Sequence, residues 1–152
     1  MKDKATDPPL GFLLVDAARL YRTGIDNAFE AAGLGLTAGE ARTLAHVNIN
    51  PGLRQTALAV RMNVEPMTLV GFLDRLEAQG LVVRETDPTD RRAKIIRLTD
   101  AAAPLLERVQ AAAATVRETA LAELPQAERD AFRAVLETIR KNLCSTGRTD
   151  DK

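Results

Sequence analysis

The sequence has little sulfur and few aromatic rings, and these shortages exclude several classes of protein. Its one cysteine, Cys144, has no partner for an intramolecular disulfide and rules out an all-cysteine metal site. Aromatic residues make up only 3% of the chain, so the core must be aliphatic and alanine-rich, which suits helices. There is one histidine, His46, and no carboxylate cluster, glycine-rich phosphate loop or metal-ligand spacing. We therefore expect no enzyme activity, no metal and no cofactor.

Long apolar runs are also absent. No run approaches the roughly 20 residues of a membrane-spanning helix. The first residues, MKDKATDPPLG, have no apolar core beside their charges, so an export signal is not expected. These absences predict a cytoplasmic protein without a membrane partner. With 152 residues, 45% hydrophobic and 28% charged, the composition is that of a globular protein of one domain or a compact pair.

The net charge is zero, but the two signs are unevenly spread. Residues 41–97 carry nine basic and six acidic side chains, whereas the segments before and after this stretch carry a small excess of acid. No acidic residue occurs from Ala41 to Val64, and residues 91–97 hold four bases and no acid. This distribution favours a specific DNA-binding protein over a general polycation. A solvated basic surface is the alternative.

Residues 53–98 carry the pattern of a DNA-reading unit. A short helix is predicted at residues 55–61 and a longer amphipathic helix at residues 65–79, separated by Met62-Asn63-Val64 and ended by Gly80. Two β-rich segments, 81–86 and 94–98, flank the turn residues Asp87-Pro88-Thr89-Asp90. Two helices and a β-hairpin in this order are the plan of a winged helix-turn-helix.

Amphipathic helices are predicted on both sides of this unit. The first spans residues 10–32, and the second follows a capping box formed by Thr37 and Glu40 and runs to about Val47. After the hairpin, Thr99-Asp100 is expected to cap a helix to about residue 123, with Pro104 near its start, and a last helix covers residues 126–143. Residues 1–9 are expected to form a disordered arm and residues 144–152 a flexible tail.

The terminal helices have apolar faces that little else in the chain can cover. Packing both ends together and against a second copy would bury these faces. A two-fold dimer would also place two recognition helices roughly 34–36 Å apart, matching a pseudo-palindromic site. A monomeric helical subdomain is the alternative. The expected class is thus mainly α with a β-hairpin wing: a DNA-binding domain at residues 35–98 and a helical dimerisation region at 10–34 and 99–143.

Three groups of residues resemble motifs of the MarR family of bacterial transcription regulators. They are VEP at residues 64–66 with Thr68, DRLE at 74–77 with GLV at 80–82, and DPTDRRAK at 87–94 with RLT at 97–99. The first group resembles the start of the recognition helix in a SlyA-like subset of that family. The resemblance covers about residues 10–143. It implies a homodimeric repressor that binds a pseudo-palindromic operator and is released by a small aromatic or phenolic ligand.

Candidate DNA contacts begin at the start of the recognition helix, where side chains meet base edges in the major groove. Glu65, Pro66, Met67 and Thr68 occupy it. Glu65 could accept a hydrogen bond from a cytosine amino group, or it could only stabilise the helix dipole. Gly71 departs from the family pattern, because relatives often carry a long basic or polar residue there. Base readout would then be weaker, or the helix would approach the DNA more closely.

Basic residues supply the other candidate contacts. The resemblance assigns Arg92 to the minor groove, and Arg91 to phosphate or to ion pairs within the wing. Lys94 and Arg54 are phosphate candidates, although relatives often have a capping serine or threonine in place of Arg54. Arg75 could contact phosphate, but the resemblance favours a pair with Asp90 or Asp87 that holds the wing. A winged helix used only for protein contact is the rival function.

The resemblance also implies a cleft for an anionic effector between the dimer helices and the reading lobe. Arg19, Tyr21, Arg22, Arg42 and His46 could line it as cationic and ring partners of a carboxylate. Surface arginines and a packed tyrosine are the alternative for these residues. Peroxide sensing is not expected, because no cysteine lies near the first helix, although a disulfide between the Cys144 residues of two subunits stays open.

Overall fold

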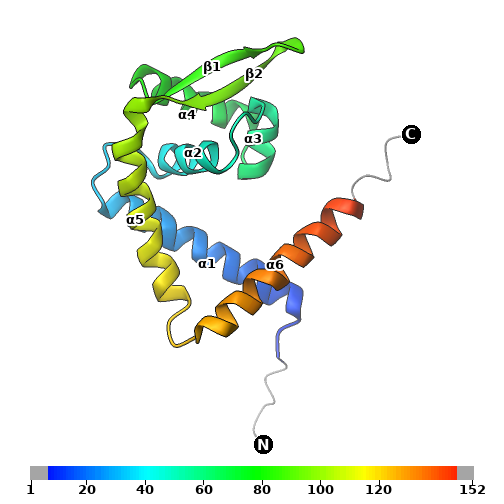
Figure 1. Cartoon of the computed structure of the whole chain (residues 1–152). Coiled ribbons are helices and arrows are strands. Elements are labelled where there is room, and N and C mark those ends of the chain that lie inside the picture. The colour runs from blue at the N-terminus through cyan, green and yellow to red at the C-terminus, as the bar shows by residue number, and fades with distance from the viewer. Residues whose placement is uncertain (1–6, 147–152) are drawn as a thin grey trace, which may run out of the picture. The chain divides into compact units, whose positions relative to one another are not determined.

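The computed structural model describes residues 7–146 and contains, within that range, six α-helices and one two-stranded sheet (Figure 1). This mainly helical fold with a hairpin confirms the predicted class. The chain divides into two compact units, residues 1–116 and 117–152. The elements in order are α1 (Leu10–Ala31), α2 (Ala38–Ile49), α3 (Gln55–Met62), α4 (Pro66–Ala78), β1 (Val82–Asp87), β2 (Asp90–Leu98), η1 (Asp100–Ala102), α5 (Ala103–Ala120) and α6 (Gln126–Thr146).

The residues at the ends of helices α2, α3 and α4 explain where these helices start and stop. The predicted capping box at the start of α2 is present: Thr37 Oγ1 accepts from the Glu40 N–H at 3.3 Å, and Glu40 Oε2 accepts from the Thr37 N–H at 3.0 Å. Helix α3 ends at Asn63, whose left-handed backbone (φ 52°) turns the chain toward α4. Helix α4 starts with Pro66, whose missing N–H costs nothing in the first turn.

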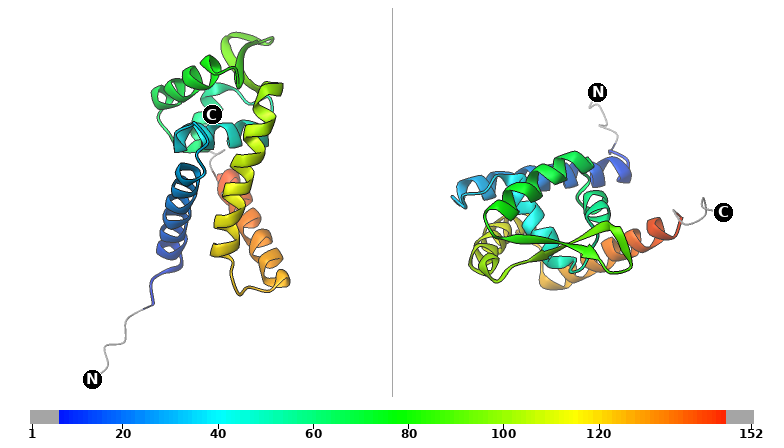
Figure 2. Two further views of the ribbon diagram at one scale, coloured as in Figure 1. Left: turned by 90° about the vertical axis from the view of Figure 1, so that its left-hand side faces the viewer. Right: turned by 90° about the horizontal axis from the view of Figure 1, so that it is seen from above.

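The hairpin is longer than the sequence predicts. Strands β1 and β2 pair antiparallel from Val82 with Leu98 to Asp87 with Asp90, so β2 begins four residues before the predicted start at Lys94. The register shifts by three residues between Thr86, which pairs with Lys94, and Asp87, which pairs with Asp90, so residues 91–93 bulge between these two pairs. The hairpin lies at the outer edge of the lobe with its turn at the free end (Figures 1 and 2).

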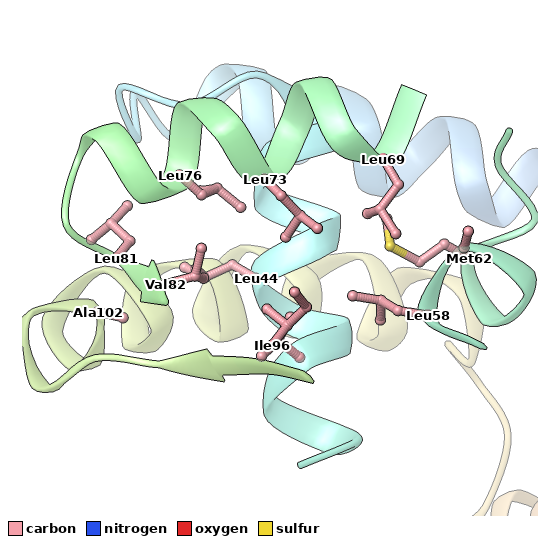
Figure 3. Packing of buried hydrophobic residues seen from close by; sticks show 12 residues of the cluster. Leu44, Leu58, Met62, Leu69, Leu73, Leu76, Leu81, Val82, Ile96 and Ala102 are labelled. Atoms are coloured by element: carbon pink, nitrogen blue, oxygen red, sulfur yellow. The ribbon is translucent and has the colours of Figure 1, made fainter. Parts of the chain in front are cut away.

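Helices α2, α3 and α4 and the hairpin, called the winged lobe below, enclose one apolar core. The leucines of α4 point toward α2 and the strands (Figure 3). Helical spacing predicts core positions at Leu69, Phe72, Leu73 and Leu76; the three leucines are fully buried, whereas Phe72 is only half-buried. Burying side chains of this size contributes roughly 1.5–3 kcal/mol each, so this core fixes the lobe. The cluster comprises Leu44, Val47, Leu58, Ala59, Met62, Leu69, Leu73, Leu76, Leu81, Val82, Ile96 and Ala102.

A second, smaller cluster attaches α1 and the first part of α5 to α2. It contains Phe29, Leu34, Ala41 and Val109, all buried. Between β2 and α5 the chain makes a short 3₁₀ turn, η1, so α5 begins at Ala103 rather than at the predicted Thr99-Asp100 cap. Pro104 then lies in the first turn of α5, where it does not break the helix.

Residues 117–152 form the second unit. Its turn is held by Arg129, which donates to the Leu121 and Leu124 carbonyls at 2.9 and 3.0 Å and pairs with Glu118 at 2.9 Å. Helix α6 runs to Thr146, past the predicted end at Leu143, and the rest of the predicted tail lies outside the described residues, as do residues 1–6 of the predicted arm.

Both terminal helices expose apolar side chains. Helix α6 has no buried residue, and α1 has only Phe29. On each helix taken by itself, exposed apolar side chains at helical spacing are the kind of surface that interaction sites often have. The exposed residues are Leu10, Phe12, Leu13, Leu14, Val15, Leu20 and Tyr21 on α1, and Phe132, Val135, Leu136 and Leu143 on α6.

Candidate nucleic-acid interface

The start of α4 presents its side chains to solvent. Glu65 is the N-cap residue, with extended backbone and no side-chain cap bond, and Pro66, Met67 and Thr68 form the first exposed turn. Met67 is 77% exposed. The N–H groups of a first helical turn have no partner within the helix and attract anions. This end of α4 therefore combines donors, the positive helix dipole and an apolar contact surface.

An ion pair that was not predicted from the sequence joins α4 to α2. Arg75 Nε donates to Glu40 Oε1, and the Arg75 guanidinium lies 5.7 Å from the centre of the Phe72 ring. The expected pair of Arg75 with Asp90 or Asp87 is therefore wrong. Glu40 is nearly fully buried and serves both the cap of α2 and this pair. Because half of the Arg75 side chain stays exposed, the pair leaves part of the guanidinium accessible.

Strand β1 is tied to α4 by Arg84, a residue that sequence reasoning missed. Its guanidinium donates to Asp74 at 2.5 Å and to Glu77 at 3.2 Å, and the Arg84 N–H donates to Glu77. The arginine lowers the pKa of the Glu77 carboxyl through these hydrogen bonds. An arginine in a strand shortly after two helical carboxylates was the available signal, but the sequence alone does not show on which face of the strand it lies.

Arg54 joins α3 to the tip of the wing. Its Nε donates to Asp87 Oδ2 at 2.7 Å, and its Nη2 donates to Thr89 Oγ1 at 3.3 Å. The other oxygen of Asp87 accepts from the Thr89 N–H and hydroxyl, both at 2.8 Å. These bonds, the backbone N–H first, lower the pKa of Asp87. The predicted phosphate contact Arg54 is thus already engaged by the wing, although 44% of its side chain is exposed.

The basic side chains of the wing tip differ in whether they already have a hydrogen-bond or ion-pair partner in the protein. Lys94 Nζ donates to Thr86 across the strands at 2.9 Å. The side chains of Arg91 and Arg92 are exposed, and among residues 7–146 neither guanidinium has a hydrogen bond or ion pair. The Arg92 backbone N–H donates to Asp90 Oδ1 at 3.0 Å, which fixes the chain where this side chain leaves it. Two unneutralised arginines at a protruding tip suit insertion beside DNA phosphates.

The residues predicted to line an effector cleft fall into two groups. Arg19 pairs with Asp16 on the exposed side of α1, at 2.7 Å, and Tyr21 is 42% exposed. Arg22 instead reaches α3, where its Nη2 donates to the Met62 carbonyl at 3.3 Å. Arg19 and Arg22 therefore do not share one environment, and only Arg22 lies toward the winged lobe.

Arg42 and His46 of α2 lie with Arg22 and Asp26 of α1. Arg42 Nε is 2.9 Å from Asp26 Oδ1, but the N–H does not point at the oxygen, so the contact is ionic and both atoms lack a hydrogen bond. Burial raises the pKa of Asp26. Burial, with Arg22 and Arg61 nearby, lowers the pKa of His46, whose Nδ1 is also buried without a partner. Arg42 Nη1 is likewise buried without a hydrogen-bond partner.

Other kinds of site find no support in the described part of the chain. Among residues 7–146, no three histidine, cysteine or carboxylate side chains are grouped so as to hold a metal. No helix in that range is long and apolar enough to cross a bilayer. Cys144 is exposed near the end of α6.

The chain is similar to known transcription regulators over most of its length. The profile of the MarR family matches residues 34–93. A protein assigned to transcriptional regulation of the hcr operon in Thauera aromatica is 36% identical over 112 residues, which cover 74% of this chain and 68% of that protein.

Solved structures show the same likeness in three dimensions. A MarR-family regulator from Rhodococcus sp. RHA1 is 27% identical, with a TM-score of 0.74, and the match covers 90% of this chain and 95% of that one. CouR from Rhodococcus jostii RHA1, solved with p-coumaroyl-CoA bound, is 28% identical, with a TM-score of 0.70, and the match covers 90% and 94% of the two chains.

Proposed function

Since the chain belongs to the MarR family of transcriptional regulators, whose members are not enzymes, we propose that it represses transcription by binding a pseudo-palindromic operator as a homodimer. The observation that carries the proposal is the pair of unneutralised arginines, Arg91 and Arg92, on the same lobe as the exposed start of α4. In this proposal Glu65, Pro66, Met67 and Thr68 meet the major groove, and Arg92 enters the minor groove.

Further basic residues contact phosphate in the same proposal. Arg91 and Lys94 lie on the wing, and the exposed half of Arg75 lies on α4. Gly71 adds no side chain to this surface, so α4 reads bases mainly through its first turn. Because bound cations displace counterions from phosphate, affinity for DNA falls as the salt concentration rises. In a plot of the logarithm of the binding constant against the logarithm of the salt concentration, each phosphate contact contributes a slope of about −0.9.

The dimer proposed here uses the helices at residues 10–34 and 99–143, and the DNA-binding domain spans residues 35–98. Support comes from the exposed apolar faces of α1 and α6. Val135→Asp would place a charge on this face of α6, where the valine is 54% exposed and no packed core is disturbed. Sedimentation velocity at fixed concentration should show the variant as a monomer and the wild type as a dimer. A dimeric variant would exclude this face from the interface.

A small aromatic or phenolic anion is the proposed effector, in the region of Arg22, Arg42 and His46. The unsatisfied buried donors of this region support it, and CouR, a structural relative, binds p-coumaroyl-CoA. The side chains of Arg19 and Tyr21 are exposed on α1, so in this proposal they contact the effector only from the edge of the site. A ligand releases DNA only by its differential affinity for the free and DNA-bound conformations. Titrating the protein–DNA complex with p-coumarate, p-coumaroyl-CoA and an uncharged phenol would test the charge requirement.

Operator binding is tested first by fluorescence anisotropy. The probe is duplex DNA from the region upstream of the protein's own gene, beside a scrambled duplex, at several salt concentrations. Arg92→Ala should weaken binding at least tenfold, the loss of one charge-assisted contact. Lys141→Ala, an equal change of charge at an exposed position that helical spacing places opposite the apolar face of α6, is the matched control and should bind as the wild type does. Equal affinity for both duplexes would refute recognition of this DNA, and equal loss in the two variants would refute the role of the wing tip.

A further inference from the structure

The residues just before α3 hold the wing at two levels, through their backbone along the body of β2 and through a side chain at the turn. The Ile96 N–H donates to the Leu53 carbonyl at 3.4 Å, and Arg54 and Ile95 form an isolated antiparallel bridge. Beyond this bridge the Arg54 guanidinium reaches the turn, at Asp87 and Thr89. A two-stranded hairpin is at best marginally ordered alone in water, so contacts near its free end decide how well the tip is fixed.

Asp87 is the centre of these contacts. It is only 6% exposed, and both of its carboxylate oxygens are used, one by Arg54 and the other by Thr89. The chain of contacts continues through Asp90, whose Oδ2 lies 3.9 Å from Arg54 Nη1 and whose Oδ1 accepts from the Arg92 N–H. An unbroken set of polar contacts therefore runs from the start of α3 to the backbone of Arg92.

We propose that Arg54 and Asp87 form a clamp that positions the wing tip, so that Arg54 acts on DNA through the placement of Arg92 rather than as an independent phosphate contact. This inference rests on the proposed DNA binding. A tip that is already ordered in the free protein loses less conformational entropy when it enters a groove, which raises affinity without any new contact.

The clamp and a phosphate contact predict opposite effects of Asp87→Asn. The substitution removes a negative charge close to the DNA, so simple electrostatics makes binding tighter or leaves it unchanged. If Asp87 holds Arg54 and the turn, the neutral amide weakens both contacts and operator affinity falls, by about tenfold for the loss of a charge-assisted hydrogen bond. The sign of the change alone separates the two roles.

Arg54→Lys supplies a second discriminating variant. Lysine keeps the positive charge that a phosphate needs, but its ammonium cannot bond Asp87 and Thr89 with the fixed geometry of a guanidinium. We expect Arg54→Lys to lose nearly as much operator affinity as Arg54→Ala. Retention of wild-type affinity in the lysine variant would show that charge, not the clamp, is what matters.

A double-mutant cycle with Arg92 completes the test. In the Arg92→Ala background, Arg54→Ala should cost less than about threefold, because there is no longer a side chain to position. Losses that multiply independently, or a fall of about one in the salt slope caused by Arg54→Ala in the Arg92→Ala background, would overturn the proposal in favour of a direct phosphate contact. Thermal unfolding of each variant establishes that the lobe remains folded.

A measurement on the free protein keeps the clamp testable even if the DNA proposal fails. Backbone ¹⁵N relaxation of Thr89, Arg91 and Arg92 should show larger amplitude motion in Asp87→Asn and Arg54→Ala than in the wild type, with the amides of α4 unchanged. Wing mobility equal to the wild type in both variants refutes the clamp. Wild-type protein that fails to prefer any upstream or genomically selected duplex refutes the proposed function instead.

Discussion

Gly39 is the position where adding one methyl group should destabilise the lobe most clearly. It lies in the first turn of α2, and the Cβ of an alanine there would be within 2.9 Å of three atoms of the Phe72 ring. The ring itself is rigid, so Phe72 must leave its rotamer or α4, which carries it, must shift. Overpacking of this kind costs roughly 1–3 kcal/mol, against a gain in helix propensity of up to about 1 kcal/mol. We expect Gly39→Ala to be destabilised by about 1–2 kcal/mol.

Gly71 provides the matched control, since it also lies in a helix of the lobe. A Cβ there meets only the flexible end of Arg75, at 3.7 Å. Gly71→Ala should therefore be stabilised by up to about 1 kcal/mol. Thermal unfolding at one fixed protein concentration would show shifts of about 2–4 °C per kcal/mol, downward for Gly39→Ala and upward for Gly71→Ala.

Phe72→Leu tests the stated cause of the Gly39 effect. If the ring causes the clash, Gly39→Ala should cost less in the Phe72→Leu background than in the wild type. A Gly39→Ala protein as stable as the wild type, or an equal cost in both backgrounds, would refute the reasoning.

Three further predictions concern stability. His46 has a lowered pKa in the folded protein, so the unfolded chain binds more protons below the ordinary value of 6.5 and stability should fall as pH drops through that value. His46→Gln should flatten this dependence in thermal unfolding scans between pH 5 and 7.5, and an unchanged slope would contradict the assignment. Arg84→Ala, which unties β1 from α4, should lower the free energy of unfolding in urea by about 1 kcal/mol or less, because its carboxylate partners are largely exposed. Leu73→Ala, at a fully buried position, should cost about 2–5 kcal/mol in the same assay, and a cost below 1 kcal/mol would mean that the core is not packed as described.

Features encoded by neighbouring residues could be predicted from the sequence. The capping box of Thr37 and Glu40 depends on two side chains three positions apart, and it forms as expected. The buried leucines of α4 follow from helical spacing, and Gly80 adopts the positive φ expected after the last turn. Local geometry decides these features, so tertiary contacts had little to change.

Pairings between residues far apart in the sequence could not be predicted in the same way. Arg54 lies beside the wing carboxylates Asp87 and Asp90, which the family resemblance assigns to Arg75. Arg75 pairs with Glu40 instead. Glu40 was already explained as a cap, so nothing in the sequence indicated its second role as the partner of Arg75. The early start of β2 was missed because Asp90, a usual turn residue, pairs here with Asp87.

The unequal burial of the helices has a consequence for hydrogen exchange. The winged lobe closes its own core, so the slow amides of α2 and α4 should keep their protection at any protein concentration. Helix α6 has no buried residue of its own, and a second copy that covers it would be the source of its protection. Dilution below the dimer dissociation constant should then release the amides of α6 while those of the lobe stay protected. Exchange recorded across a dilution series would therefore separate, within one chain, the stability of the fold from that of the assembly.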